Sequence, residues 1–266
     1  MNDAEVARAA AAVGAAIVRD RFGGAHQRLD KGGLDFATDV DIDAERAIVD
    51  ILRRERPADH IVGEEGGRQP GTAEGRTWLV DPLCGTANFA AGFRAVAVNV
   101  ALVGRGGAGA AAVADPLTGE IFAADDDGAC CYAGTGAVRL TPGGSSRLVD
   151  IDLDERPLPT RFKPLALLGD AEFRAAFQPR VTSTSLALTW VAAGRRAAYI
   201  TDAALIENVH FAAGVAICLA ARCAVSDLRG DPVSPGSAGA GLIAAADWTT
   251  HARLLAIIQR MAGGQG

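Results

Sequence analysis

A single segment, residues 78–89, constrains this chain more than any other. It reads Trp-Leu-Val-Asp-Pro-Leu-Cys-Gly-Thr-Ala-Asn-Phe. Its apolar start predicts a buried strand that ends at Asp81, and Pro82 then turns the chain. Gly85 and Thr86 begin a new segment whose free backbone amides can face an anion. The segment therefore predicts a site for an anionic group beside a carboxylate, at the end of a strand.

Hydrophobic periodicity predicts helices at both ends of the chain and short strands between them. The predicted helices span 3–21, 41–55, 171–177, 185–193, 211–223 and 248–261. The predicted strands span 60–63, 77–81, 95–103, 110–115, 120–124, 165–168 and 197–201. A stretch rich in Pro, Gly and Ser at 141–146 separates a run of consecutive predicted strands from a region in which predicted strands and helices alternate. We expect an N-terminal α+β part over 1–142 and a C-terminal α/β part over 143–266.

Composition narrows the class of protein. The formal net charge of −6 gives no basic surface, which argues against a nucleic-acid partner and favours a small-molecule substrate. No apolar run reaches membrane-spanning length, and the N-terminus is typical of an amphipathic helix, not of a signal peptide. The five cysteines are an odd number without a CxxC pattern. These features predict a reduced, cytoplasmic protein without a membrane anchor.

Three motifs occur in a fixed order: Gly63-Glu64-Glu65, then Asp81-Pro82-Leu83-Cys84-Gly85-Thr86, then the segment His-Phe-Ala-Ala-Gly at 210–214. In order and spacing the chain resembles the inositol monophosphatase family, whose members show GEE, D-P-(I/L)-D-G-T-x-N-F and W-D-x-A-A-G. Weaker similarity covers most of the remaining chain. The resemblance implies a layered αβαβα sandwich and hydrolysis of phosphate monoesters with Mg²⁺ ions. Since members of this family are often homodimers, it also implies a homodimer.

Position by position, the resemblance assigns roles to residues of this sequence. Glu64, Asp81 and the backbone carbonyl of Leu83 match the ligands of the first metal ion. Thr86 and Asp41 match the pair that orients the attacking water. The amides of Gly85 and Thr86 match the phosphate cradle. All of the residues that this half of the chemistry requires are present.

The second metal position differs. The family holds that ion with the Asp of the DP motif, the Asp three residues later and the Asp of the WD motif. Here the three positions are Asp81, Cys84 and His210. Thiolate and imidazole are poor ligands for Mg²⁺, which prefers oxygen donors. Loss of that ion predicts a rate lower by on the order of a thousandfold or more.

Three hypotheses follow from this replacement. In the first, Cys84 and His210 form a working pair, with Asp81 or Asp41 orienting the imidazole and a lowered thiol pKa, for acyl transfer, isomerisation or cyclisation without a metal. In the second, the chain is a phosphomonoesterase that uses one Mg²⁺ with His210 as general acid, or a Zn²⁺ ion held by the mixed ligand set. In the third, the protein is a non-catalytic pseudophosphatase. The first hypothesis is preferred, because both replacements fall in one pocket and form a complementary acid/base pair.

Overall fold

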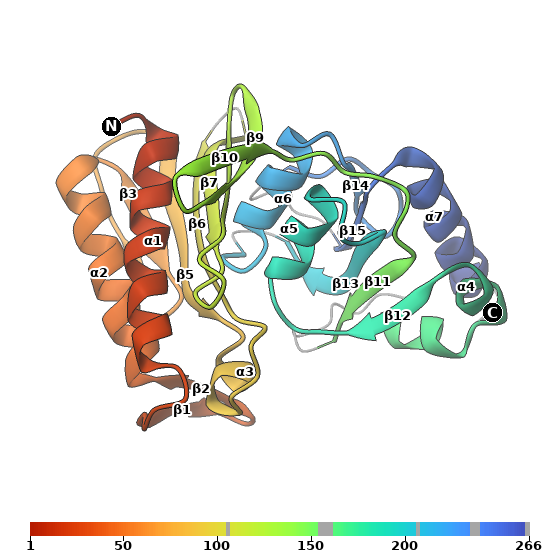
Figure 1. Ribbon diagram of the computed structural model, residues 1–266, viewed down its shortest axis with the longest axis horizontal. Helices are drawn as coiled ribbons and strands as arrows, with labels where there is room; N and C mark the ends of the chain where they lie inside the picture. The colour runs from red at the N-terminus through yellow and green to blue at the C-terminus, as the bar shows by residue number, and fades with distance from the viewer. Residues whose placement is uncertain (105–106, 154–161, 206–207, 235–239, 264–266) are drawn as a thin grey trace.

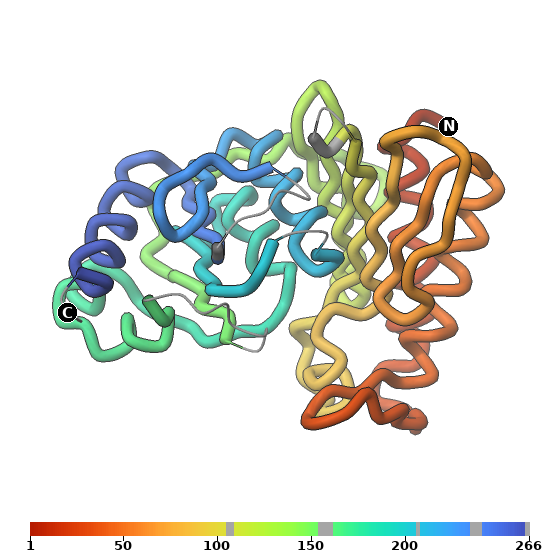
Figure 2. Tube along the Cα trace, turned by 180° about the vertical axis from the view of Figure 1, so that it is seen from behind, coloured from red at the N-terminus to blue at the C-terminus, as the bar shows by residue number. Residues whose placement is uncertain are grey.

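Five layers of helices and sheets stack side by side, as the computed structural model in Figure 1 shows. The structure describes residues 1–104, 107–153, 162–205, 208–234 and 240–263. The order of the layers is helices, an eight-stranded sheet, helices, a five-stranded sheet and helices. Helices α1 and α7 lie at opposite ends of the stack (Figures 1 and 2). This arrangement confirms the expected αβαβα sandwich.

The first layer is a pair of packed helices, α1 (Asp3–Arg21) and α2 (Asp39–Glu55). Each begins with a capping box, in which the side chain before the helix and the acid at its third position satisfy each other's backbone amides. In α2 these residues are Thr38 and Asp41. The cap therefore fixes the orientation of a carboxylate that the sequence assigns to the site.

The second layer is a sheet in the strand order β10-β9-β8-β7-β6-β5-β3-β4. Its strands are β3 (His60–Gly63), β4 (Gly67–Gln69), β5 (Arg76–Cys84), β6 (Ala97–Gly104), β7 (Gly107–Ala114), β8 (Ile121–Asp125), β9 (Gly128–Ala133) and β10 (Gly136–Arg139). All neighbouring strands are antiparallel except β3 and β5, which are parallel. The carboxyl ends of β3 and β5 consequently lie side by side.

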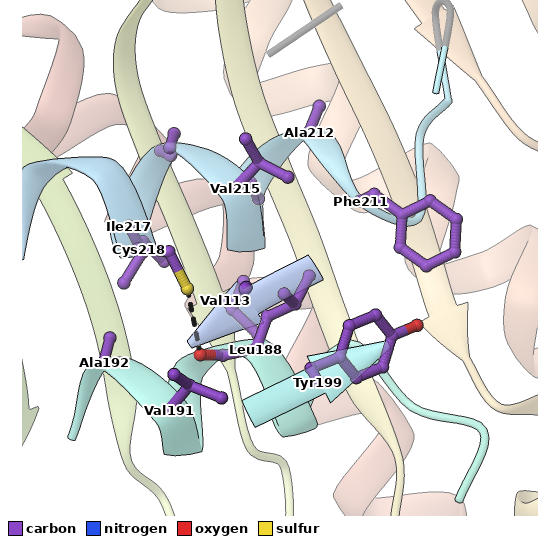
Figure 3. Packing of buried hydrophobic residues seen from close by; sticks show 14 of the residues in the cluster. Val113, Leu188, Val191, Ala192, Tyr199, Phe211, Ala212, Val215, Ile217 and Cys218 are labelled. Atoms are coloured by element: carbon purple, nitrogen blue, oxygen red, sulfur yellow. Dashed lines mark hydrogen bonds between the residues drawn. The ribbon is translucent and has the colours of Figure 1, made fainter. Parts of the chain in front are cut away.

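The third layer is formed by α5 (Leu186–Ala192) and α6 (Ala212–Ala220), which fill the space between the two sheets. Figure 3 shows their side chains meeting Val113 of β7 on one side and Tyr199 of β13 on the other. The Cys218 thiol donates to the Leu188 carbonyl, with 3.2 Å between sulfur and oxygen. The largest apolar cluster of the described residues is therefore the one that joins the two halves of the chain.

The fourth and fifth layers belong to the C-terminal half. The sheet has the order β12-β11-β13-β15-β14, with β11 parallel to both of its neighbours. Its strands are β11 (Leu148–Asp152), β12 (Gln178–Val181), β13 (Ala198–Ala204), β14 (Ala224–Ser226) and β15 (Ala240–Ala245). The outer helices are the 3-10 helix η1 (Pro164–Gly169), α4 (Ala171–Ala176) and α7 (Trp248–Gly263). Together they cover the face of the sheet opposite α5 and α6.

Two small elements lie along one edge of the first two layers. They are the hairpin of β1 (Arg28–Gly32) and β2 (Asp35–Thr38), and the short helix α3 (Thr86–Ala90). Both lie at the same edge in Figures 1 and 2, where α3 approaches β2. The hairpin leads directly into α2, and α3 follows β5. Both segments therefore border the carboxyl ends of β3 and β5.

Two differences from the predicted elements have clear physical reasons. The strand predicted at 165–168 is wrong, because these residues belong to η1. A short apolar run fits a strand or a helix equally, and Pro164 suits the first position of a helix. No strand is predicted at β11, because the buried acids Asp150 and Asp152 interrupt its apolar pattern. Their partners, Arg196 and Tyr199, lie on or next to the neighbouring strand β13.

All described strands of the eight-stranded sheet precede residue 140, and those of the five-stranded sheet follow residue 147. The boundary at 142/143 between two domains stays a prediction. No helix among the described residues is both long and apolar enough to cross a membrane.

Helix α6 depends on a close approach to α5 that only glycine permits at position 214. A Cβ added to Gly214 would lie 2.6 Å from Leu188 Cδ1 and 2.8 Å from Leu188 Cβ. We expect Gly214→Ala to lower the free energy of unfolding by about 1–3 kcal/mol, because overpacking outweighs the better helix propensity of alanine. Denaturant unfolding measures this, with Gly169→Ala as the matched control, since a Cβ there meets nothing within 4 Å. Equal stability of the two variants would contradict the packing argument.

Candidate active site

The parallel pairing of β3 and β5 brings two carboxylates together at one edge of the sheet. Gly63 pairs with Val80, so Glu64 and Asp81 follow at adjacent positions. The Glu64 amide donates to the Val80 carbonyl at 3.1 Å and continues the ladder by one residue. Asp81 is fully buried, whereas the Glu64 side chain is partly exposed. The edge of the sheet thus presents a pair of acids, as the motifs predict.

A bulge after Asp81 turns the next residues toward the site. Asp81 pairs with Asn99 of β6 and Cys84 pairs with Ala97, so two residues of β5 lie opposite a single one of β6. Gly85 then adopts a φ of 88°, a left-handed conformation that favours glycine. This turn starts α3 at Thr86. A phosphate cradle at the amides of Gly85 and Thr86 stays a prediction.

His210 reaches the site from the other half of the chain. It precedes α6, which packs on β6, β7 and β8 of the large sheet. The His210 amide donates to Asn208 Oδ1 at 2.9 Å, which fixes the turn before the helix. Its ring Nδ1 lies 2.8 Å from Asp81 Oδ2, and its side chain is 25% exposed. The insertion of α6 between the sheets therefore places the imidazole over Asp81.

Asp81, Cys84 and His210 converge on one point. The donor atoms of these three side chains all lie within 4.8 Å of one another. The Cys84 thiol is within hydrogen-bonding reach of the imidazole, and it also accepts the Ser185 amide at 3.2 Å. The juxtaposition of Cys84 and His210 that the replaced motif positions imply is present.

The protonation states differ from those expected of an activated thiol. Burial, reinforced by the charge of Asp81, raises the pKa of Cys84 to about 11. Burial also acts to lower the pKa of His210, but the Asp81 carboxylate outweighs it and holds that pKa well above its usual range. The same pairing with His210 keeps the pKa of Asp81 below its ordinary value, although burial opposes it. The expectation of a lowered thiol pKa is wrong here, because burial and Asp81 outweigh the neighbouring imidazole.

Asp41 and Thr86 form the second part of the site. Thr86 Oγ1 lies 3.0 Å from Asp41 Oδ1 and 3.1 Å from the Leu83 carbonyl oxygen. Asp41 Oδ2 accepts the amide and the hydroxyl of Thr38, which is the cap of α2. Burial raises the pKa of Asp41, although these hydrogen bonds oppose the shift. A hydroxyl is therefore fixed against a buried carboxylate.

Glu64 lies between Asp81 and the hairpin residue Lys31. Burial and the charge of Asp81 raise the pKa of Glu64 to about 9. Lys31 Nζ lies 3.2 Å from Glu64 Oε1 and also pairs with Glu65, whose side chain is only 6% exposed. Glu64 Oε2 is buried and has no hydrogen-bond partner among the described residues.

Several supporting residues are not predicted from the sequence. The Glu45 carboxylate accepts the amides of Glu65 and Gly66, at 2.8 and 2.6 Å, and so holds the turn that carries Glu64. Asn99 donates to Asp81 Oδ2 at 3.0 Å, and Ser185 Oγ donates to Asn99 Oδ1 at 2.8 Å. Only Glu45 carries a local signal, since it lies one helical turn after Asp41. The others depend on strand register and on the position of α5.

Comparisons with known proteins agree with this geometry. A family model described as the inositol monophosphatase family matches residues 2–262. The chain belongs to this family. It is 35% identical over 171 residues to an inositol-1-monophosphatase of Caulobacter vibrioides, which covers 62% of this chain and 66% of that protein, just under two thirds of its length. It is 33% identical over 205 residues to the Nus factor SuhB of Salmonella typhimurium, covering 75% of this chain and 74% of that protein.

A solved structure supports the fold of this inositol monophosphatase family member. The IMPase of Thermotoga maritima matches with a TM-score of 0.82, covering 100% of both chains at 21% identity. At that identity the likeness concerns the fold alone.

The family implies two magnesium positions, and the side chains fit only one of them. Glu64, Asp81 and the Leu83 carbonyl offer oxygen donors, which suit Mg²⁺, and the unpartnered Glu64 Oε2 is available as a ligand atom. At the second position the donors besides Asp81 are a thiol and an imidazole. This set does not fit magnesium, because Mg²⁺ binds soft sulfur and nitrogen donors poorly.

The raised pKa of Glu64 predicts that the metal-free protein loses stability against unfolding as the pH rises. The pKa of Glu64 in the folded protein, about 9, is higher than in the unfolded chain, so protonated Glu64 favours folding. This contribution to the free energy of unfolding is complete below the unfolded pKa. It is lost as the pH rises toward 9. Glutamine stays neutral throughout. With a chelator present, we therefore expect Glu64→Gln to melt at a higher temperature than the unmodified chain, by a margin that grows from about pH 5 to about pH 9.

Thermal unfolding across this pH range measures the margin. Glu172→Gln, on the exposed face of α4, serves as the control. A margin that stays constant with pH, or that shrinks as the pH rises, would contradict the shift at Glu64.

Proposed function

We propose that this chain hydrolyses phosphate monoesters of a small molecule, such as an inositol phosphate or another sugar or alcohol phosphate. The observation that carries the proposal is the hydroxyl of Thr86, held between the Asp41 carboxylate and the Leu83 carbonyl. The name inositol-1-monophosphatase of the Caulobacter vibrioides relative supports the same chemistry. The choice departs from the metal-free hypothesis preferred from the sequence, because burial leaves the Cys84 thiol protonated at neutral pH.

The residues around Thr86 can prepare a water molecule for attack. The Thr86 hydroxyl has one proton, so when it donates to Asp41 or Leu83 its lone pairs remain available to a water. Asp41 is buried and its pKa is raised, which brings it closer to the range of a useful general base. Because the cap of α2 fixes Asp41 through Thr38, the Asp41 carboxylate and the Thr86 hydroxyl are held in a fixed orientation relative to each other. Their task is to orient the water and to take its proton.

Glu64, Asp81 and the Leu83 carbonyl would hold a magnesium ion beside this pair. When bound, Mg²⁺ supplies Lewis-acid stabilisation of the phosphate charge. Glu45 keeps the Glu64 turn in place, and Asn99 keeps Asp81 in place. These contacts pre-organise the acids before any substrate binds.

The expectations about binding partners, oligomeric state and cellular location stay predictions. The net charge of −6 argues against a nucleic-acid partner, but several relatives carry the name Nus factor SuhB, so the comparisons do not support that expectation. The homodimer is implied by the family only. A cytoplasmic location is supported by the five free cysteines. The pseudophosphatase hypothesis corresponds to failure of the assay below.

Release of phosphate from a generic monoester with Mg²⁺ tests the proposal. We expect Glu64→Ala to abolish release, because it removes a metal ligand. We expect Thr86→Val to lower kcat by about 100-fold or more, because it removes the hydroxyl that positions the water. Thr86→Ser is the matched control and should keep most of the activity. No release by the unmodified chain with Mg²⁺, Mn²⁺ or Zn²⁺ would refute the proposal.

A second candidate function is nucleophilic chemistry at Cys84. The arrangement of the three side chains favours it: Asp81 lies 2.8 Å from His210 Nδ1, and the Cys84 thiol lies beside the same ring. The Ser185 amide, which donates to the sulfur, would stabilise a thiolate. Such a site would take an acyl or similar electrophilic metabolite. Its weakness is the thiol itself, which is 8% exposed and has a raised pKa.

Alkylation separates this candidate from the phosphatase. Because burial raises the pKa of Cys84 to about 11, we expect iodoacetamide at neutral pH to modify Cys84 more slowly than the half-buried Cys130 in metal-free protein. Mass spectrometry of peptides from timed samples gives both rates. Fast, selective modification of Cys84 that is lost in His210→Ala would instead support the thiol function.

A further inference from the structure

We propose that Asp81, Cys84 and His210 form a binding site for a thiophilic divalent cation of the zinc class. The inference rests on the proposed function in one respect, because Asp81 is shared with the predicted magnesium position. It assigns a metal to the point where the side chains do not fit the magnesium of the family. The site would make this chain a mixed-metal member of its family.

The geometry suits one ion. The three donor atoms lie within 4.8 Å of one another. In a tetrahedral site, bonds of about 2.0 to 2.3 Å put two donors of a zinc ion about 3.3 to 3.7 Å apart, so the most widely separated donors would have to approach each other by no more than about 1.5 Å. The three residues come from the end of β5, from its bulge and from the turn before α6. Donors from separate rigid elements, not from one flexible loop, converge here.

The donor chemistry selects the class of ion. A thiol, an imidazole and a carboxylate together are typical of zinc sites and unsuited to Mg²⁺ or Ca²⁺. The neighbourhood is rich in carboxyl groups, since Glu64 and Asp41 border Asp81, and a bound cation would favour their ionised forms. Among the described residues, Lys31 is the lysine that pairs with these acids, and it contacts Glu64, not the sulfur. A dication at this point would therefore be well balanced by charge.

Neighbouring groups form hydrogen bonds to the proposed donor side chains. The Ser185 amide donates to Cys84 Sγ, the kind of contact that stabilises a metal thiolate. Asp81 is held by the Leu83 amide at 3.1 Å and by Asn99 at 3.0 Å. His210 Nδ1 lies 2.8 Å from Asp81 Oδ2 and the ring is also within hydrogen-bonding reach of the Cys84 thiol, so a cation bound here would replace these direct contacts between the three donors. Ser185 thus supports two donors at once, since its hydroxyl also fixes Asn99.

Cobalt titration tests the site directly. Reduced, chelator-treated protein is titrated with Co²⁺ without oxygen, and the absorption band of cobalt bound to a thiolate is followed in the near ultraviolet. We expect one equivalent of Co²⁺ to produce this band, and stoichiometric Zn²⁺ to remove it. In Cys84→Ser the band should disappear and the Zn²⁺ affinity should fall by about 10-fold to 100-fold or more.

Two variants control the experiment. Cys131→Ser removes a half-buried thiol that lies near Glu120, away from the site, and should keep the band. The double variant Cys84→Asp with His210→Asp restores oxygen donors and should exchange the cobalt–thiolate band for a preference for Mg²⁺. Thermal unfolding of each variant confirms that it is folded.

The outcomes are distinct. Cobalt that binds without a thiolate band, or a band that persists in Cys84→Ser, would overturn the zinc-class site. If the cobalt result is negative in this way but the same preparation releases phosphate with Mg²⁺ alone, the zinc-class site is refuted and the proposed function is still supported. A thiolate band in a protein without phosphatase activity would support the site and refute the proposed function.

Discussion

The burial of the Asp81 carboxylate is the constraint on which the rest of the site depends. An ionised carboxylate removed from water is costly unless it is paired and hydrogen-bonded. Asp81 meets this requirement through the Leu83 amide, Asn99 and His210. Two of these partners belong to the large sheet and the third comes from the far half of the chain. The site therefore exists only when the two halves are packed together.

Helix α6 makes that packing specific. Gly214 lets α6 approach α5, and the apolar cluster between the sheets fixes both helices. Because His210 lies two residues before the start of α6, the position of the helix between the sheets sets the distance from imidazole to carboxylate. The same cluster positions Ser185, which precedes α5 and contacts both Cys84 and Asn99. Apolar packing and the chemistry of the site are in this way coupled.

One part of the site keeps the residues of the inositol monophosphatase motifs, and the other part has Cys84 and His210 in their place. Asp41, Thr86, Glu64 and the Leu83 carbonyl form an oxygen-rich arrangement suited to water and a hard cation. Cys84 and His210 form a softer arrangement around the same Asp81. Burial keeps the thiol protonated in the absence of a cation, so its chemistry as a ligand is better supported than its chemistry as a nucleophile. The proposals above follow from this division.

The sequence by itself determined the family, the described α-helices other than α3, the central strands of the large sheet and the main acids of the site. Local patterns sufficed for these, because capping residues, apolar periodicity and the Asp81-Pro82 turn act over a few residues. The order of the motifs also identified Cys84 and His210 as replacements. Where the local pattern was ambiguous, as at Leu165 in η1, the sequence failed.

Only the tertiary structure decided how these residues behave. The pKa of Cys84 depends first on burial under α5 and α6, which no residue near position 84 encodes, and then on the charge of the neighbouring Asp81. The burial of the Glu65 side chain depends on Lys31 of the β1–β2 hairpin, and the Glu65 amide is held by Glu45 of α2. Electrostatic and solvation energies are set by groups that are distant along the chain and close in space. That is why composition and motif order predicted the residues of the site, and the packed fold decided their protonation.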